Sequence, residues 1–114
     1  MNAFFIKQNN ILKKIPFDEV LWIKAEGNYS MVYVGSKRFV LKISLKKVLD
    51  QLPNDIFQQI HRAYIVAIDQ VDDIDISNNE PTVGQEKLPI GRSYRDGLLS
   101  NCLLYTSPSP RDRG

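Results

Sequence analysis

The chain has 114 residues, of which 43% are hydrophobic, and its formal net charge is +2. This length fits one domain with a modest core, and the sequence has neither an apolar run long enough to cross a bilayer nor the apolar segment of a signal peptide. The single cysteine, Cys102, excludes an internal disulfide framework and a cysteine-rich metal site, so we expect a cytoplasmic protein without a cofactor.

Charge is distributed unevenly along the chain. Residues 1–50 contain nine lysines and arginines against four acidic residues, whereas residues 51–101 contain four against eight. Four aspartates crowd together between positions 69 and 75. Such asymmetry can give a small domain one basic and one acidic face, and phosphate binding needs a basic face. An unevenly charged soluble surface with no such role explains the pattern equally well.

Short strands between turn-rich spacers are predicted through most of the chain. Gly27-Asn28 and Gly35-Ser36-Lys37 supply turn chemistry between alternating or apolar runs, which favours an antiparallel meander at the start of the chain. The last two strands form a hairpin around Gln85-Glu86. The predicted strands cover residues 4–7, 11–15, 20–25, 29–34, 38–43, 61–68, 71–76, 81–84 and 87–90.

One segment changes to a helical period. Ser44 is a good N-cap, the apolar residues Leu45, Val48, Leu49 and Leu52 recur on one helical face, and Pro53 ends the run. Residues 93–99 are predicted to form a short C-terminal helix. The fold class is therefore mostly β, with about ten short antiparallel strands and one embedded helix.

The last residues differ in composition from the rest. Residues 102–114 have neither strand alternation nor a helical stripe, and the string is similar to a sequencing-library adapter translated in frame. We expect residues 1–101 to form the domain and residues 102–114 to be a non-native, disordered tail that plays no part in the fold.

Three segments carry polar or cationic side chains at the ends of strand-like runs: 27–30 (Gly-Asn-Tyr-Ser), 57–66 (Phe-Gln-Gln-Ile-His-Arg-Ala-Tyr-Ile-Val) and 88–95 (Leu-Pro-Ile-Gly-Arg-Ser-Tyr-Arg). Together they resemble the LytTR-type DNA-binding domain, the output module of many bacterial response regulators, over roughly residues 3 to 99. The resemblance implies an elongated β-domain that inserts loops into successive DNA grooves and regulates transcription. It also implies dimers on repeated sites and, in many members, a receiver or membrane domain before this one.

Arg62 is the strongest candidate for contact with double-stranded DNA. Its guanidinium is a planar fork of donors that suits a guanine edge or a phosphate, and it should emerge near a loop. From the residues alone, a structural ion pair with an aspartate at 69–75 is the favoured interpretation. The resemblance favours DNA, because a His-Arg pair is typical of the family at this strand.

The other candidate DNA contacts also depend on the resemblance and on the chemistry of their side chains. The resemblance implies base contacts from Arg92 and from the loop of Asn28, Tyr29 and Ser30, and an Asn amide can read adenine. Arg92 and Arg95 could instead decorate a helix, and Asn28 could be only a turn former. The candidates for contact with the DNA backbone are Lys24, His61, Ser93 and Arg95.

The rival interpretation is a small β-domain that binds a partner protein or a signalling nucleotide. His61 has no second histidine to share a metal, and no nucleophile lies in a recognisable catalytic motif, so an enzyme is not expected. Trp22, Phe39, Leu41 and Phe57 lie in alternating or buried runs, which predicts core positions and not base-stacking platforms.

Overall fold

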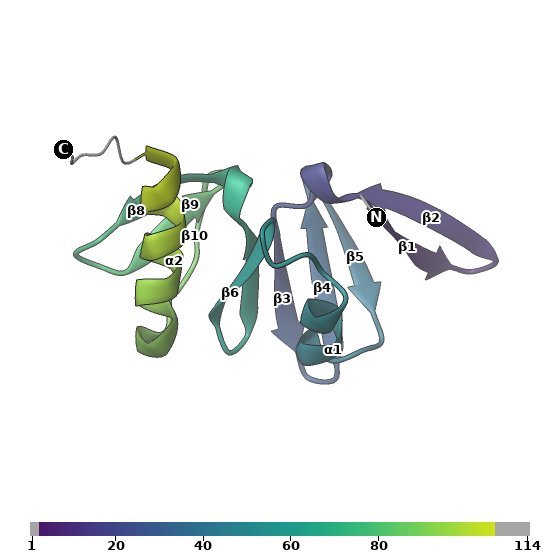
Figure 1. Ribbon diagram of the computed structural model, residues 1–114. Helices are drawn as coiled ribbons and strands as arrows, with labels where there is room; N and C mark the ends of the chain where they lie inside the picture. Colours follow the sequence, from purple (N-terminus) through teal and green to yellow (C-terminus); the bar gives the residue numbers. More distant parts are fainter. Residues whose placement is uncertain (1–2, 107–114) are drawn as a thin grey trace.

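Ten short antiparallel strands form three separate sheets in the computed structural model, which describes residues 3–106 (Figure 1). The molecule is elongated, with extents of 55 × 27 × 25 Å. The strands of the described chain are β1 (Ala3–Gln8), β2 (Ile11–Pro16), β3 (Trp22–Glu26), β4 (Tyr29–Val34), β5 (Lys37–Leu41), β6 (Phe57–His61), β7 (Tyr64–Ala67), β8 (Val71–Asp75), β9 (Glu80–Val83) and β10 (Glu86–Lys87).

The central sheet has five strands in the order β5-β4-β3-β7-β6. Strands β3, β4 and β5 form the predicted meander. The hairpin β6–β7 comes later in the chain and pairs through β7 with the free side of β3, where Trp22 lies opposite Val66 and Lys24 opposite Tyr64. The other two sheets are the β1–β2 hairpin at one end of the molecule and β10-β9-β8 at the other (Figure 1).

Two α-helices flank the central sheet. Helix α1 (Leu45–Asp50) begins as predicted, because the Ser44 hydroxyl accepts a hydrogen bond from the main-chain N–H of Lys47 at 3.3 Å. Helix α2 (Arg92–Thr106) is longer than predicted and continues into the segment set aside as a tail. The rest of that segment, residues 107–114, lies outside the described residues.

The central sheet is buried on both faces, since neighbouring residues of one strand belong to different hydrophobic clusters. Ile23 and Ile65 pack with α1 and with Phe17 of the short 3₁₀ helix η1 (Phe17–Glu19). Trp22 and Val66 pack on the other face with residues of α2 and of the three-stranded sheet. Burial on both faces explains why successive residues are apolar at Trp22-Ile23 of β3 and at Ile65-Val66 of β7. Trp22, Phe39 and Phe57 are buried as predicted, and Leu41 is half-buried.

Two details of the predicted strands are wrong. Residues 61–68 do not form one strand, because the chain turns at Arg62-Ala63 between β6 and β7. The last hairpin turns at Gly84 and Gln85, both with positive φ, so β10 ends at Lys87 and residues 88–90 leave the sheet.

Leu98 provides a test of how α2 is held. Its side chain is fully buried in the cluster that joins α2 to the central sheet. Leu98→Ala should lower the free energy of unfolding by about 2–5 kcal/mol, because it removes apolar contacts and leaves a cavity. Urea denaturation followed by circular dichroism measures this change. The matched control is Ser100→Ala on the exposed side of α2, which should change stability by less than about 0.5 kcal/mol. Equal, small effects would show that α2 does not depend on this contact.

Candidate nucleic-acid interface

The register of β3 brings two turns to the same end of the central sheet. At the C-terminal end of β3, Glu26 lies opposite Tyr29 of β4, and Lys24 lies opposite Tyr64 of β7. Because β3 is antiparallel to both neighbours, the β3–β4 turn and the β6–β7 turn must both lie beyond that end. The main-chain N–H of Ala25 also donates to the carbonyl of Ala63 at 2.8 Å, which ties the second turn to β3.

The start of α2 is joined to the same end through β6. A bulge between Gln59 and His61 leaves Ile60 out of the paired register with β7. The Ile60 carbonyl instead accepts a hydrogen bond from the main-chain N–H of Gly91 at 2.7 Å. A Cβ atom on Gly91 would lie 2.9 Å from Cδ2 of Tyr94, so a side chain at this position would crowd that ring. This bond places Arg92 beside the β6–β7 turn.

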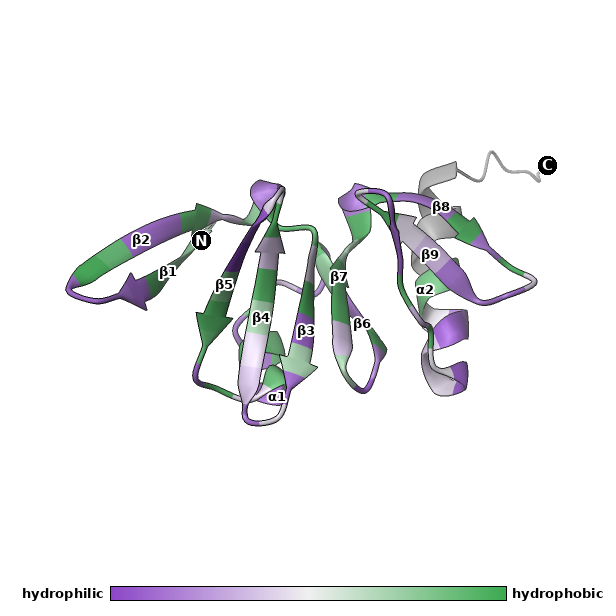
Figure 2. Ribbon diagram, turned by 180° about the vertical axis from the view of Figure 1, so that it is seen from behind, coloured by the Kyte–Doolittle hydropathy of each residue, from purple (hydrophilic) through white to green (hydrophobic). Residues whose placement is uncertain are grey.

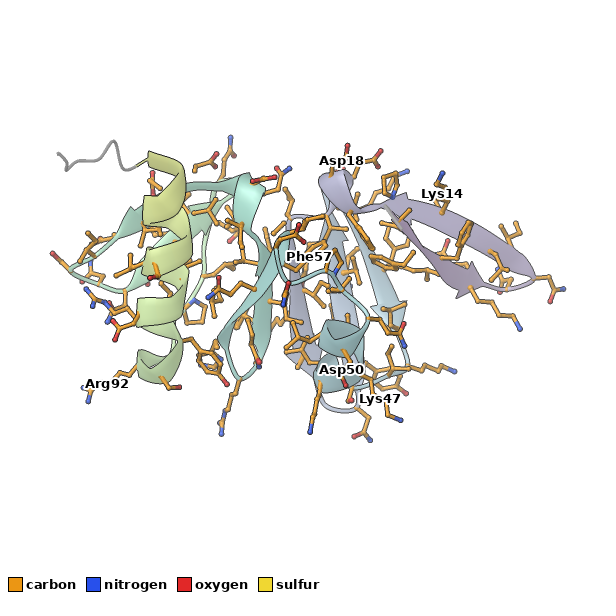
Figure 3. All side chains as sticks on the ribbon, in the orientation of Figure 1. Lys14, Asp18, Lys47, Asp50, Phe57 and Arg92 are labelled. Carbon is orange, nitrogen blue, oxygen red and sulfur yellow. The ribbon has the colours of Figure 1, made fainter. Side chains whose placement is uncertain are left out.

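We call this part of the molecule the turn end: the β3–β4 turn, the β6–β7 turn and the first turn of α2 (Figure 1). Its polar candidate side chains are exposed to solvent, whereas the strands behind them are buried. Figure 3 shows Arg92 pointing away from the body of the protein at this end. The exposed candidates here are Asn28, Tyr29, Arg62, Arg92 and Ser93.

Lys24 and His61 lie around one aromatic ring. The Lys24 ammonium lies 5.9 Å from the centre of the Tyr64 ring, and the His61 ring meets the same ring edge-on at 5.6 Å. His61 Nδ1 accepts a hydrogen bond from the main-chain N–H of Ala63 at 3.1 Å, which closes the β6–β7 turn. Both predicted candidates are therefore half-buried and held in place. Tyr64, which positions them, was not predicted from the sequence as a site residue, because its place at the start of β7 indicates only a strand.

Two of the predicted contacts have structural partners. Ser30 is fully buried, and its hydroxyl donates to the main-chain carbonyl of Ile43 at 2.8 Å. Its prediction as a DNA contact is therefore wrong, because the hydroxyl cannot reach a ligand at the surface. Arg95 Nε donates to the side-chain oxygen of Asn79 at 2.6 Å, which ties α2 to the loop before β9. The guanidinium of Arg95 remains about one-third exposed, with its side chain 34% accessible.

The structure adds two cations to the turn end. Lys46 and Lys47 are exposed on α1, and Figure 3 places Lys47 at the same end as Arg92. The sequence alone does not show which end of the sheet this helix covers. The N-terminus of α2 points to the same end, so its partial positive charge adds to that of Arg92.

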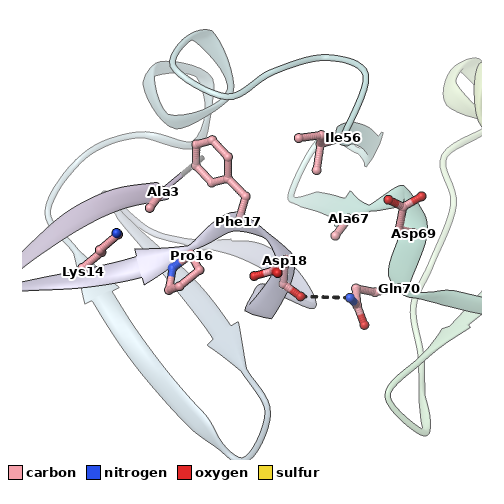
Figure 4. A pocket seen from close by; sticks show the side chains of 9 residues that line it. All are labelled: Ala3, Lys14, Pro16, Phe17, Asp18, Ile56, Ala67, Asp69 and Gln70. Carbon is pink, nitrogen blue, oxygen red and sulfur yellow. Dashed lines mark hydrogen bonds between the residues drawn. The ribbon is translucent and has the colours of Figure 1, made fainter. Parts of the chain in front are cut away.

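Acidic groups gather at the opposite end. Asp18 of η1 lies there (Figure 3), and the side-chain amide of Gln70 donates to its main-chain carbonyl at 3.0 Å. This bond brings Asp69, in the 3₁₀ helix η2 (Ile68–Gln70), close to Asp18 (Figure 4). Both ends carry charges of both signs: Glu26 and Asp50 lie at the turn end with its cations, and Lys14 lies near Asp18 and Asp69 at the opposite end.

The fold and the comparisons agree on the class of protein. The fold is that of a solved structure, the LytTr DNA-binding domain of a methyl-accepting/DNA response regulator from Bacillus cereus, with a TM-score of 0.75 at 22% sequence identity. The match covers 89% of this chain and 96% of that one. The sequence profile of the LytTr DNA-binding domain matches residues 10–102, so the chain belongs to the LytTR family of DNA-binding domains.

A curated relative gives further context. The chain is 34% identical over 64 residues to an uncharacterized response regulatory protein from Vibrio cholerae serotype O1. The aligned segment is 53% of this chain and 24% of the relative, so the chain spans about a quarter of that protein. Within residues 3–106, no helix is long and apolar enough to cross a membrane.

Substitution of Ser30 tests whether its hydroxyl stabilises the fold and has no part in DNA binding. Ser30→Ala removes the donor to Ile43 and leaves a carbonyl without its partner, which should lower the free energy of unfolding by about 1–3 kcal/mol. Thermal and urea unfolding measure this loss. Ser36→Ala, in the exposed β4–β5 turn, is the matched control and should be nearly neutral. DNA affinity of the folded Ser30 variant should equal that of the wild type, and a selective loss of affinity would restore Ser30 to the interface.

Proposed function

We propose that this domain binds double-stranded DNA sequence-specifically by placing the turn end in successive grooves, and that it regulates transcription in this way. The observation that carries the proposal is the hydrogen-bonded connection from β3 through Ala63 to Ile60 and Gly91. It holds exposed Arg62 and Arg92 on neighbouring elements of one end, where Lys46 and Lys47 add further positive charge. Membership in a family of DNA-binding domains supports the same function.

Base readout is assigned to the residues at the tips. Arg62 and Arg92 each offer the bidentate fork that matches the O6 and N7 acceptors of guanine in the major groove. Asn28 offers the donor and acceptor pair that matches adenine, and the exposed Tyr29 lies beside it. Because these side chains belong to rigid, hydrogen-bonded turns, little conformational entropy is lost when they meet the bases.

Contacts with the DNA backbone are assigned to the cations set back from the tips. Lys24 and His61 flank Tyr64, and both present polar nitrogen atoms behind the two turns. Ser93 and the remaining donors of Arg95 lie on the first turn of α2. Lys46 and Lys47 extend the positive surface onto α1. Such contacts fix the register of the protein on the duplex without reading sequence.

The proposed context is bacterial two-component signalling in the cytoplasm. The relative from Vibrio cholerae is called a response regulatory protein, and this chain corresponds to about a quarter of it. We infer that the domain works as the output module of a longer chain with a receiver or membrane domain. It would act as a pair of domains on repeated sites.

Salt dependence tests the electrostatic part of the proposal. Each neutralised phosphate should contribute about −0.9 to the slope of log K against log salt on duplex DNA. Fluorescence anisotropy over a salt series should give a steep slope, and a duplex should bind more tightly than single strands of equal length, because the turns need grooves. Stronger binding to single strands would contradict the proposal and favour a different nucleic-acid-binding module. A flat slope would also contradict it and would favour a protein-binding domain.

Arginine substitutions test base readout. Arg62→Ala or Arg92→Ala should each cost about 1–3 kcal/mol on a duplex selected by the wild-type domain, because each removes one bidentate contact. Binding to a scrambled duplex should change far less. The matched control is Arg38→Ala, an exposed arginine at the first residues of β5, away from the turn end.

Comparison with Lys24→Ala separates the two kinds of contact. This variant should weaken selected and scrambled duplexes alike and make the salt slope shallower by about one unit. If the folded arginine variants instead lose equal affinity for both duplexes, Arg62 and Arg92 contact only phosphate and the assignment of base readout is wrong.

A further inference from the structure

A groove opens at the surface where the β1–β2 hairpin, β5 and α1 meet, and we call it the hairpin groove. Its volume is about 400 Å³. Among the lining residues that the structure describes, Gln51 has the one polar side chain, and all the others are hydrophobic. Sites for small molecules are typically concave, mostly apolar and of this size or larger. The hairpin groove therefore has the form of a binding site for an apolar ligand or an apolar part of one.

The hairpin groove reaches from solvent to the hydrophobic core. Phe17 and Val48, which line it, are core residues and each is only 4% exposed. Phe5 and Ile43, at its mouth, are 58% and 36% exposed. Figure 2 shows the hydrophobic stretches of the hairpin and the hydrophobic end of β5. A slender, flexible chain can reach the buried residues of this hollow, whereas a flat membrane surface meets the hairpin and α1 first.

Cations lie beside the mouth of the hairpin groove. A second hollow, of about 450 Å³, shares Leu41 and Ile43 with the groove, so the two are continuous. Lys7 of β1 and Lys42, which follows β5, line this second hollow, and both are exposed. Among the residues that the structure describes, no carboxylate lines either hollow. An apolar channel thus ends at two positive charges that no neighbouring acidic group in its lining neutralises.

The charge of a third hollow is different. This cavity of about 350 Å³, at the base of the hairpin, also has apolar walls, which include Phe17 and Ile56. Asp18 and Asp69 line it as well, against the single cation Lys14 (Figure 4). The excess of carboxylates disfavours an anionic ligand there. The hairpin groove is therefore the hollow that matches a molecule with an apolar chain and a negative head group.

We propose that the hairpin groove binds an alkyl carboxylate, the class of small molecule to which fatty acids belong. The hydrocarbon chain would pack against Phe17 and Val48, and the carboxylate would pair with Lys7 and Lys42. Removal of the chain from water supplies most of the affinity, because each buried methylene is favourable. The two exposed ion pairs contribute less, but they select the head group. This site does not depend on the proposed DNA-binding function.

The length of the hydrocarbon chain tests the apolar part of the site. The full chain is titrated in a calorimeter with hexanoate, octanoate and decanoate, each at concentrations at which it forms no micelles. The Kd should fall about fourfold for each added methylene, because that group leaves water for the groove. The melting temperature should rise as well, because the ligand binds the folded state. A Kd that does not change with chain length overturns the proposal.

The head group tests the charged part of the site. Decanoate should bind about 2- to 30-fold more tightly than decanol, because it gains two exposed ion pairs. Decylammonium should bind more weakly than either, because Lys7 and Lys42 repel it. Equal affinity for the three compounds overturns the proposal. Vesicles that contain phosphatidylglycerol are the comparison with a membrane: adsorption to them without binding of decanoate indicates a membrane-binding surface and also overturns the proposal.

Substitution of the two lysines locates the head group. The double variant Lys7→Gln, Lys42→Gln should bind decanoate about 2- to 30-fold more weakly and decanol as the wild type does. The matched control is Lys37→Gln with Lys87→Gln, which changes the net charge equally at exposed positions outside both hollows. The control should bind decanoate like the wild type. If the two double variants behave alike, these lysines do not recognise the carboxylate and the proposal is overturned.

A carboxylate placed at the mouth tests the position of the ligand. Ile43→Glu should weaken decanoate binding at least about 10-fold, because it adds like charge and removes apolar surface. Ile76→Glu, at an isoleucine that is 61% exposed beyond β8, is the matched control and should bind normally. Circular dichroism checks folding, and Phe5→Glu replaces Ile43→Glu if the latter does not fold. Wild-type affinity in a folded mouth variant overturns the proposal, whether or not the domain binds DNA.

Discussion

The hydrogen bond from the Gly91 N–H to the Ile60 carbonyl, 2.7 Å long, is the contact on which the turn end depends. Residues 88–90 belong to no strand, so the chain reaches α2 through an irregular connection. A bulge in β6 frees the Ile60 carbonyl, and the missing side chain of Gly91 leaves room for the Tyr94 ring, whose Cδ2 lies 2.9 Å from where a Cβ would stand. Together with the bond between Ala25 and Ala63, this contact converts three separate segments into one rigid surface. Neither bond involves a side chain, so the side chains at the tips remain available for a ligand.

Much of this arrangement could be predicted from local signals. Gly27-Asn28 marked a turn, Ser44 marked a helix start, and a β-branched and aromatic run placed His61 and Arg62 near a strand end. The sequence-based predictions failed where strand pairing or the burial of a side chain depends on a residue far away along the chain. The pairing of β3 with β7 joins segments about forty positions apart, and no local pattern specifies it. The same holds for the burial of Ser30, whose partner is Ile43, and for Arg95, whose partner Asn79 lies in the turn between β8 and β9. A turn signal indicates where the chain reverses but not which side chains of the turn face inward.

The small net charge of +2 conceals an uneven distribution of charge. Arg62, Arg92, Lys46 and Lys47 gather at the turn end, which also holds Glu26 and Asp50, whereas Asp18 and Asp69 lie at η1 and η2 together with Lys14. A polyanion approaching in solution is therefore attracted most strongly to the exposed cations of the turn end. Composition alone cannot reveal this distribution, because opposite charges cancel in the net charge wherever they lie in the fold.

The buried residues of the paired strands and the exposed residues of the turns are different sets, and this affects how the domain can diversify. The residues that specify the sheet, such as Ile23 and Ile65, point into the two cores, whereas Asn28, Arg62 and Arg92 lie beyond the ends of the pairing and support none of it. Substitution of these exposed turn residues should thus hardly change the free energy of unfolding. A lineage of such domains could exchange one target sequence for another by single steps at these positions, while selection for stability acts on a different set of residues.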